Sequence, residues 1–244
     1  MTCRRVILSL VVAGLSACVT TDQDNSRARV LSQTLTSTVQ IFDIRQDGGN
    51  RAGSGVALGP GTELGQTLIL TTKHFLEPIT NHTAYVMDPL RTKKVNAQVV
   101  AISADSDLAI LSVSGLSLTP VVFKSEAQLG DEVWVVAFPW GRRRTVVSGI
   151  VSQISWGKDQ PSEVPIKGAV SLIDASVSYG TSGGGVFDAN DGGLHGIVSG
   201  YRSAELSLPG NKEVSIKLPV AGETTVIATT EILRFLKSEK IEIK

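Results

Sequence analysis

Two short apolar runs flank a turn in the stretch GGVFDANDGGLHGIV, residues 184–198. The turn residues Asn-Asp-Gly-Gly favour a tight reversal of the chain, so the stretch predicts a β-hairpin. From residue 35 onward the chain continues in the same way, with runs of Val, Ile, Leu and Thr separated by clusters of Gly, Asp, Asn and Pro. This spacing predicts an all-β barrel or sandwich fold.

A change in composition around residues 114–130 divides these runs into two groups. We therefore expect two barrels of comparable size, at residues 34–120 and 121–244. Only TTEILRFLKSEK, at 229–240, shows a clear helical period, with its apolar residues on one side. We expect it to form a helix that closes the second barrel.

The hairpin directly follows Ser182, the centre of a G-x-S-x-G pattern. That pattern also marks the nucleophile of α/β-hydrolases, in which a helix follows the serine and the acid and histidine come later in the chain. Here a hairpin follows, and the only later histidine, His195, lies within it. The α/β-hydrolase fold is therefore excluded, and we expect a packed or solvent-facing His195.

Composition excludes several functions for the 244-residue chain. The formal net charge is zero, which argues against nucleic acid as the main partner. The three histidines, His74, His82 and His195, have no metal-ligand spacing, and the two cysteines form no CxxC pair. We therefore expect no metal and no organic cofactor.

The N-terminus has the pattern of a secretory signal. Two arginines precede the apolar run VILSLVVAGLSA, which is too short to cross a bilayer comfortably. LSAC, at 15–18, resembles the lipobox of bacterial lipoproteins, and this implies cleavage of residues 1–17 and lipidation of Cys18. The alternative is an ordinary secretory signal with an incidental cysteine. Val19 stands where an aspartate would signal inner-membrane retention, so we expect an outer-membrane anchor facing the periplasm. Residues 18–33 are polar, show no period and predict a tether.

Two further residues could complete a nucleophilic site with Ser182. His74 ends an apolar strand in LILTTKHFLEP, and Asp107 precedes another in DSDLAILSV. A serine hydroxyl needs a base to become nucleophilic, and a carboxylate holds the imidazole in the required tautomer. Asp105 competes with Asp107 because both have the same strand parity.

Six motifs in order resemble trypsin-like serine peptidases of the chymotrypsin fold, and most closely the HtrA/DegP branch of bacterial envelopes. They are GSGVAL, LTTKHFL, DSDLAIL, FPWGRRRTVVSGIVS, DASVSYGTSGGGVFD and LHGIVSG. The resemblance covers about residues 35–237 and implies two six-stranded antiparallel barrels. It implies His74 as general base, Asp107 as its orienting acid and Ser182 as nucleophile. The N–H groups of Gly180 and Ser182 would bind the oxyanion.

The chain also departs from that branch. Thr181 stands where asparagine usually precedes the serine, and Thr72-Lys73 replace the residues common before the histidine. Neither change removes a catalytic group. The branch carries a PDZ domain after the protease, whereas this chain ends just past its helix. We therefore expect no PDZ-driven regulation. The sequence does not predict whether the chain is a monomer or an oligomer.

Substrate binding follows from the same resemblance. Ser176, six residues before the nucleophile, would lie at the base of the primary pocket, where an uncharged group leaves a buried Lys or Arg without a partner. Residues Ser199, Gly200 and Tyr201 would pair with the substrate backbone by strand addition. The side chain of Tyr201 would shorten the pocket. We expect cleavage after small or medium apolar residues.

The sequence therefore predicts a lipid-anchored serine endopeptidase that acts on unfolded or extended protein segments. The alternative is a silent or latent peptide-binding module of the same fold. Asp174 would support the loops of the site. Residues 142–144, three arginines, predict a solvated loop, with acidic substrates or anionic lipid headgroups as alternative partners.

Overall fold

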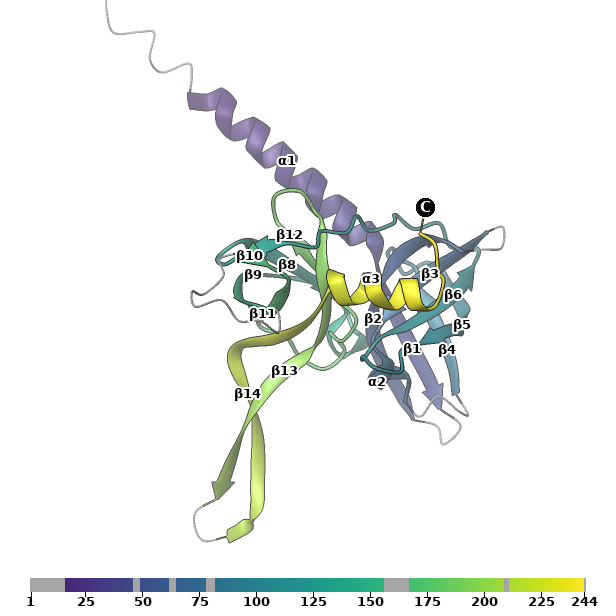
Figure 1. The fold of residues 1–244 in the computed structure, drawn as a ribbon. Coiled ribbons are helices and arrows are strands. Elements are labelled where there is room, and N and C mark those ends of the chain that lie inside the picture. Colours follow the sequence, from purple (N-terminus) through teal and green to yellow (C-terminus); the bar gives the residue numbers. More distant parts are fainter. Residues whose placement is uncertain are drawn as a thin grey trace, which may run out of the picture.

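The computed structural model describes residues 16–45, 49–61, 65–77, 82–155, 167–208 and 211–243 (Figure 1). The predicted signal peptide, residues 1–17, lies outside these ranges except for its last two residues. The side chain of Cys18 is also outside the described part of the chain. No helix among the described residues has the length and apolar character needed to cross a membrane.

The first half of the chain closes into a six-stranded antiparallel barrel, with strand order β1-β2-β3-β6-β5-β4. Its strands are β1 (Thr38–Arg45), β2 (Asn50–Pro60), β3 (Gln66–Thr71), β4 (His82–Met87), β5 (Lys94–Ile102) and β6 (Ala109–Ser114). A single helical turn, α2 (Lys73–Leu76), follows β3. Closure pairs every strand on both edges, which removes the exposed edges of an open sheet.

The second half forms another closed barrel, with strand order β11-β14-β13-β12-β8-β9. Its strands are β8 (Glu132–Ala137), β9 (Thr145–Ile154), β11 (Val170–Asp174), β12 (Gly185–Asp188), β13 (Leu194–Leu208) and β14 (Asn211–Ala228). A 3₁₀ turn, η1 (Pro139–Gly141), follows β8, and the short strands β7 (Ala127–Gln128) and β10 (Lys167–Gly168) pair beside the barrel. The hairpin predicted at 184–198 is formed by β12 and the start of β13.

Each barrel has an apolar core of its own, and a further apolar cluster spans the two barrels. Leu58 and Leu70 of the first barrel pack in the same cluster as Phe187 and Ile197 of the second. The C-terminal helix, α3 (Thr229–Ser238), adds Phe235 and two further buried apolar side chains to this cluster. The predicted all-β fold of two six-stranded barrels with a C-terminal helix is confirmed.

The segment predicted as a tether is helical. Helix α1 (Ser16–Ser37) projects from the body of the molecule, and its C-terminal end rests against the second barrel (Figure 1). Val30 and Thr34 are buried there, and the guanidinium of Arg27 lies 5.0 Å from the ring centre of Trp134. Arg144, from the arginine run, donates to Leu35 O at 2.7 Å.

Strands β13 and β14 continue beyond the barrel as a two-stranded arm. Their pairing runs from Gly196↔Ala228 in the barrel to Leu208↔Asn211 near the tip. In Figure 1 this arm points away from the two barrels, on the side opposite α1. The apolar run that marks β13 in the sequence ends at about Tyr201, so half of this strand is built from more polar residues.

His195 is buried in a charged cluster at the far end of β12. Its Nε2 lies 3.4 Å from Asp188 Oδ2, and among the described residues neither ring nitrogen makes a hydrogen bond. Lys124 bridges Asp188 and Asp191 at 2.6 and 2.7 Å. Burial lowers the pKa of His195 below its usual value, although the Asp188 carboxylate opposes this shift. Of the two positions expected for this histidine, packed or solvent-facing, the structure has the packed one.

We expect the free energy of unfolding to fall as the pH drops below about 6.5, the usual histidine pKa. Between 6.5 and the lower pKa of the folded state, the unfolded chain binds more protons at His195 than the folded chain does, which costs at most about 1.4 kcal/mol per pH unit. His195→Leu should flatten this dependence. Urea unfolding at pH 7, 6 and 5 measures it, and an equal slope in the variant would contradict the assignment.

Candidate active site

Strand pairing brings His74 and Asp107 together. β3 and β6 are antiparallel neighbours, with Thr71 opposite Ala109, so the end of β3 meets the start of β6. His74 lies in α2, just after β3, and Asp107 lies just before β6. The backbone N–H of Lys73 donates to Asp107 O at 3.3 Å and fixes this junction.

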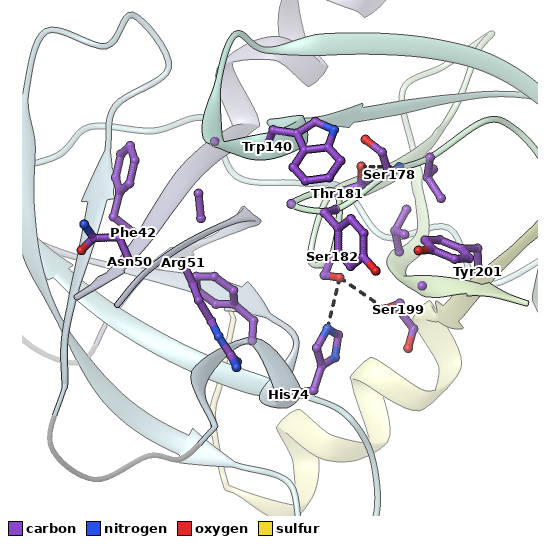
Figure 2. A pocket seen from close by; sticks show the side chains of 18 residues that line it. Phe42, Asn50, Arg51, His74, Trp140, Ser178, Thr181, Ser182, Ser199 and Tyr201 are labelled. Carbon is purple, nitrogen blue, oxygen red and sulfur yellow. Dashed lines mark hydrogen bonds between the residues drawn. The ribbon is translucent and has the colours of Figure 1, made fainter. Parts of the chain in front are cut away.

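Ser182 comes to the same place from the second barrel, at the end of the loop before β12. His74 Nε2 lies 3.1 Å from Ser182 Oγ (Figure 2). His74 Nδ1 lies 2.6 Å from Asp107 Oδ2. The backbone N–H of His74 donates to Asp107 Oδ1 at 2.8 Å. Ser199 Oγ donates to Asp107 Oδ2 at 3.3 Å, and Ser182 Oγ lies 3.4 Å from Ser199 O. The three predicted residues thus form one continuous hydrogen-bonded chain.

Asp107 is held in its charged form. Burial of the carboxyl disfavours that form, but the hydrogen bonds from the ring and backbone of His74 and from Ser199 outweigh it and keep the pKa of Asp107 below the usual value. Asp105, the competing acid, is exposed and makes none of these contacts. The geometry therefore favours Asp107 as the partner of His74.

The loop before Ser182 turns two N–H groups away from the protein. Among the described residues, neither the N–H of Gly180 nor that of Ser182 donates a hydrogen bond. The carbonyls of the same two peptide units are bound: Tyr179 O accepts from Trp140 N at 2.6 Å, and Thr181 O accepts from Gly184 N at 2.8 Å. A trans peptide points its N–H opposite its C=O, so both free donors face away from these anchors.

A cavity of about 830 Å³ contains this site. Its lining includes His74 and Ser182 together with Ser199, Gly200 and Tyr201, the three residues expected to contact substrate. No Asp or Glu is among the described lining residues. Figure 2 shows the side chains of His74, from the first barrel, and Ser182, from the second, pointing toward each other.

Ser176 is placed differently. It lines a separate cavity of about 250 Å³, which shares Val177, Ser178 and Thr181 with the larger cavity. The residue six positions before Ser182 therefore lines the smaller cavity. The next residue in the chain, Val177, lines both cavities.

Three aromatic side chains form a rim of the cavity, and of these only Tyr201 was expected to contact substrate. The rings of Trp140 and Tyr179 are 5.1 Å apart between centres, and those of Tyr179 and Tyr201 are 6.4 Å apart in an edge-to-face arrangement. A hydrogen bond with Tyr179 raises the pKa of Tyr201 above its usual value. Trp140 and Tyr179 are largely exposed to solvent, so the rim offers apolar surface beside Ser182.

Asp174 and the arginine run are not among the residues that line the cavity. Asp174 ends β11, where a Cβ on Gly222 would meet its carboxylate. Arg142 O accepts from Arg91 Nη1, so part of the arginine run is tied to the first barrel. Among the described residues, no group of three or more His, Cys, Asp or Glu is arranged to hold a metal ion.

Comparison with known proteins places this geometry in a family. The profile of the trypsin-like peptidase domain matches residues 53–197. The serine protease Rv3671c of Mycobacterium tuberculosis H37Rv is 31% identical over 146 residues, which are 58% of this chain and 36% of that protein. A probable periplasmic serine endoprotease, DegP-like, of Bartonella henselae is 31% identical over 163 residues, 65% of this chain and 30% of that protein. The chain thus spans about a third of the length of these curated relatives.

Solved structures share the two-barrel fold. The active form of the Rv3671c protease from M. tuberculosis aligns with a TM-score of 0.65 at 24% identity, over 90% of this chain and 87% of that chain. The HtrA-type protease AlgW with a tripeptide aligns with a TM-score of 0.66 at 21% identity, over 89% and 64% of the two chains. The profile match covers more than half of the chain and runs from β2 into β13. The chain therefore belongs to the trypsin-like peptidase domain family.

Proposed function

We propose that this chain is a serine endopeptidase with His74, Asp107 and Ser182 as its catalytic triad. The observation that carries the proposal is the hydrogen-bonded chain from Asp107 through His74 to Ser182, at 2.6 and 3.1 Å. The names of the relatives, both serine proteases, support it.

The geometry gives each group a step. Ser182 Oγ attacks the carbonyl carbon of the scissile peptide while His74 Nε2 takes the hydroxyl proton, and Asp107 stabilises the resulting imidazolium. The N–H groups of Gly180 and Ser182 donate to the oxyanion. The adduct collapses as His74 returns the proton to the leaving amine, which leaves an acyl group on Ser182. His74 then deprotonates a water that attacks the acyl carbonyl. His74 passes this proton to Ser182 Oγ as the carboxylic acid product leaves.

We further propose that the substrates are unfolded or extended protein segments. Ser199, Gly200 and Tyr201 belong to β13 and line the cavity, so a strand-like substrate can pair with them. The described lining has no carboxylate to pair with a Lys or Arg side chain, and the Tyr201 side chain occupies part of the space. Such a cavity suits small or medium apolar residues before the scissile bond.

This preference gives a testable prediction. A peptide library should be cleaved mainly after Ala, Val or Leu, because a buried basic side chain would lose its hydration without a partner. Tyr201→Gly should extend cleavage toward larger apolar residues. Mass spectrometry of the products identifies the cleaved bonds. Cleavage chiefly after Lys or Arg in the unmodified protein would overturn the assignment.

We also propose a location in the bacterial envelope, facing the periplasm and held by lipid on Cys18. The relatives described as periplasmic support the compartment, and the lipobox-like LSAC supports the anchor. Metabolic labelling with a palmitate analogue should mark the full chain and leave a Cys18→Ser variant unmarked.

A fluorophosphonate probe tests the proposed function directly, because it reacts with an activated serine. We expect the full chain, purified in detergent, to be labelled and to cleave casein, and Ser182→Ala to do neither. Labelling only in the presence of casein would mean that substrate orders the site. A folded protein that is neither labelled nor active would instead be a peptide-binding module.

A further inference from the structure

Ser54, a fully buried residue of β2, ties the first barrel to the loop that carries Ser182. Its backbone N–H donates to Ser182 O at 3.0 Å, and its hydroxyl donates to Gly180 O at 2.8 Å. The same hydroxyl oxygen accepts from Phe138 N at 2.9 Å, and Ser54 O accepts from Thr71 Oγ1 at 2.8 Å. Every polar group of this serine therefore has a partner in the site's framework.

These contacts complete a set of anchors along the loop. The four consecutive carbonyls of residues 179–182 each accept a hydrogen bond. Ser54 supplies two of the donors, and the N–H groups of Trp140 and Gly184 supply the other two, at 2.6 and 2.8 Å. These four hydrogen bonds favour the present arrangement of the loop, in which the N–H groups at 180 and 182 are free for a ligand.

The Ser54 hydroxyl also holds both segments that meet in the hydrogen bond from Trp140 N–H to Tyr179 O. Through Phe138 N it holds the segment that leads into η1, which carries the Trp140 N–H. Through Gly180 O it holds the loop that accepts that N–H. One hydroxyl thus sets the spacing at which Trp140 can bind the carbonyl of Tyr179.

We propose that Ser54 is a positioning residue for the oxyanion site, and that its hydroxyl keeps the Gly180 N–H directed toward the reacting carbonyl. The inference rests on the proposed endopeptidase function. It gives the first barrel, which already supplies the base and the acid, a part in building the donor site on the second barrel.

Removal of the hydroxyl would leave two groups without partners. Phe138 N–H is buried and Gly180 O loses its donor, and unpaired buried polar groups are costly. Gly180 has a φ of +87°, and glycine passes easily to other backbone conformations. Rotation of the Tyr179–Gly180 peptide would turn a carbonyl toward the oxyanion, where it repels the developing charge.

Ser54→Ala tests the kinetic consequence. With the full chain in detergent and labelled casein as substrate, we expect kcat to fall about 10- to 100-fold, up to the lower end of the loss on removing an oxyanion donor. KM should stay unchanged, because ground-state pairing along β13 is not touched. The pH profile of kcat should keep its shape, because the pair of His74 and Asp107 is intact. Ser112→Ala, another buried serine of the same barrel, is the matched control.

Amide hydrogen exchange gives a second readout that needs no activity. Thr181 and Gly184 donate within the loop, so their amides should exchange faster in Ser54→Ala and at the original rate in Ser112→Ala. An unchanged kcat, or equal losses in both variants, would overturn the proposal. If the unmodified protein cleaves nothing, the proposed function fails. Faster exchange in Ser54→Ala alone would then still support the anchoring role, and unchanged exchange would refute it.

Discussion

Asp107→Asn should lower kcat on casein by about 10⁴-fold while leaving the fold intact. The asparagine carbonyl can still accept from the backbone N–H of His74, as Asp107 Oδ1 does now at 2.8 Å. Its amide then faces His74 Nδ1, which lies 2.6 Å from Asp107 Oδ2 in the present structure. An N–H donor at that position makes Nδ1 an acceptor and puts the ring proton on Nε2. The nitrogen facing Ser182 then has no lone pair with which to take the hydroxyl proton.

Asp105→Asn is the control for this substitution, since it makes the same chemical change two residues away on an exposed side chain. It should leave kcat unchanged. Steady-state kinetics gives kcat for both variants and for the unmodified protein, and circular dichroism checks that the variants are folded. A loss of less than about tenfold in Asp107→Asn would mean that His74 does not depend on this carboxylate.

Gly183→Ala should be the most destabilising single methyl addition near the site. Gly183 has a φ of +80°, and a Cβ there would clash with Ser54 O and Thr71 Oγ1, both in the first barrel. The backbone strain costs about 1–2 kcal/mol, and the forced movement of packed atoms costs about 1–3 kcal/mol. We therefore expect the free energy of unfolding to fall by about 2–5 kcal/mol.

Gly130→Ala separates these two costs. Its φ is +87°, but no atom lies within 4 Å of an added Cβ, so only the strain applies. Urea unfolding of both variants should give a loss of about 1–2 kcal/mol for Gly130→Ala and a clearly larger one for Gly183→Ala. Equal losses would mean that the two barrels separate easily enough at Ser54 to admit a methyl group.

The fold, and the meeting of His74, Asp107 and Ser182, could be predicted because their signals are local. Strands of four to nine residues alternate with turn residues, and each triad member lies inside a short motif at a strand end. The choice of Asp107 over Asp105 depended on resemblance, because both have the same parity along the chain. Pairing of Thr71 with Ala109 supplies the physical reason, since it sets which carboxylate meets the α2 turn.

Ser54 and Trp140 could not be assigned from the sequence, because their contacts connect distant parts of the chain. Ser54 and Gly180 are 126 residues apart, and nothing in GSGVAL indicates where the hydroxyl will point. Ser176 shows a similar limit: counting along a loop does not tell which of two adjoining cavities a residue enters.

Helix α1 escaped prediction for another reason. The side chains of α1 are described from residue 25 onward, and there only Val30, Thr34 and Ser37 are buried, while residues 25–29 are all exposed. The periodic pattern by which an amphipathic helix is recognised is therefore missing. The polar arm of β13 and β14 is equally hard to recognise, because alternation of apolar residues marks only strands with a buried face.

The helical form of α1 changes how the enzyme would sample its surroundings. At a rise of about 1.5 Å per residue, the part of the helix from residue 18 to residue 37 spans about 30 Å. A random coil of that length would have a broad range of end-to-end distances. With lipid on Cys18, as we propose, such a stem would set an upper limit of about 30 Å on the distance between the bilayer and the end of the helix at the second barrel. The proposed active site would then reach only substrates within a limited distance of the bilayer. Proteins held farther away would escape cleavage whatever their sequence.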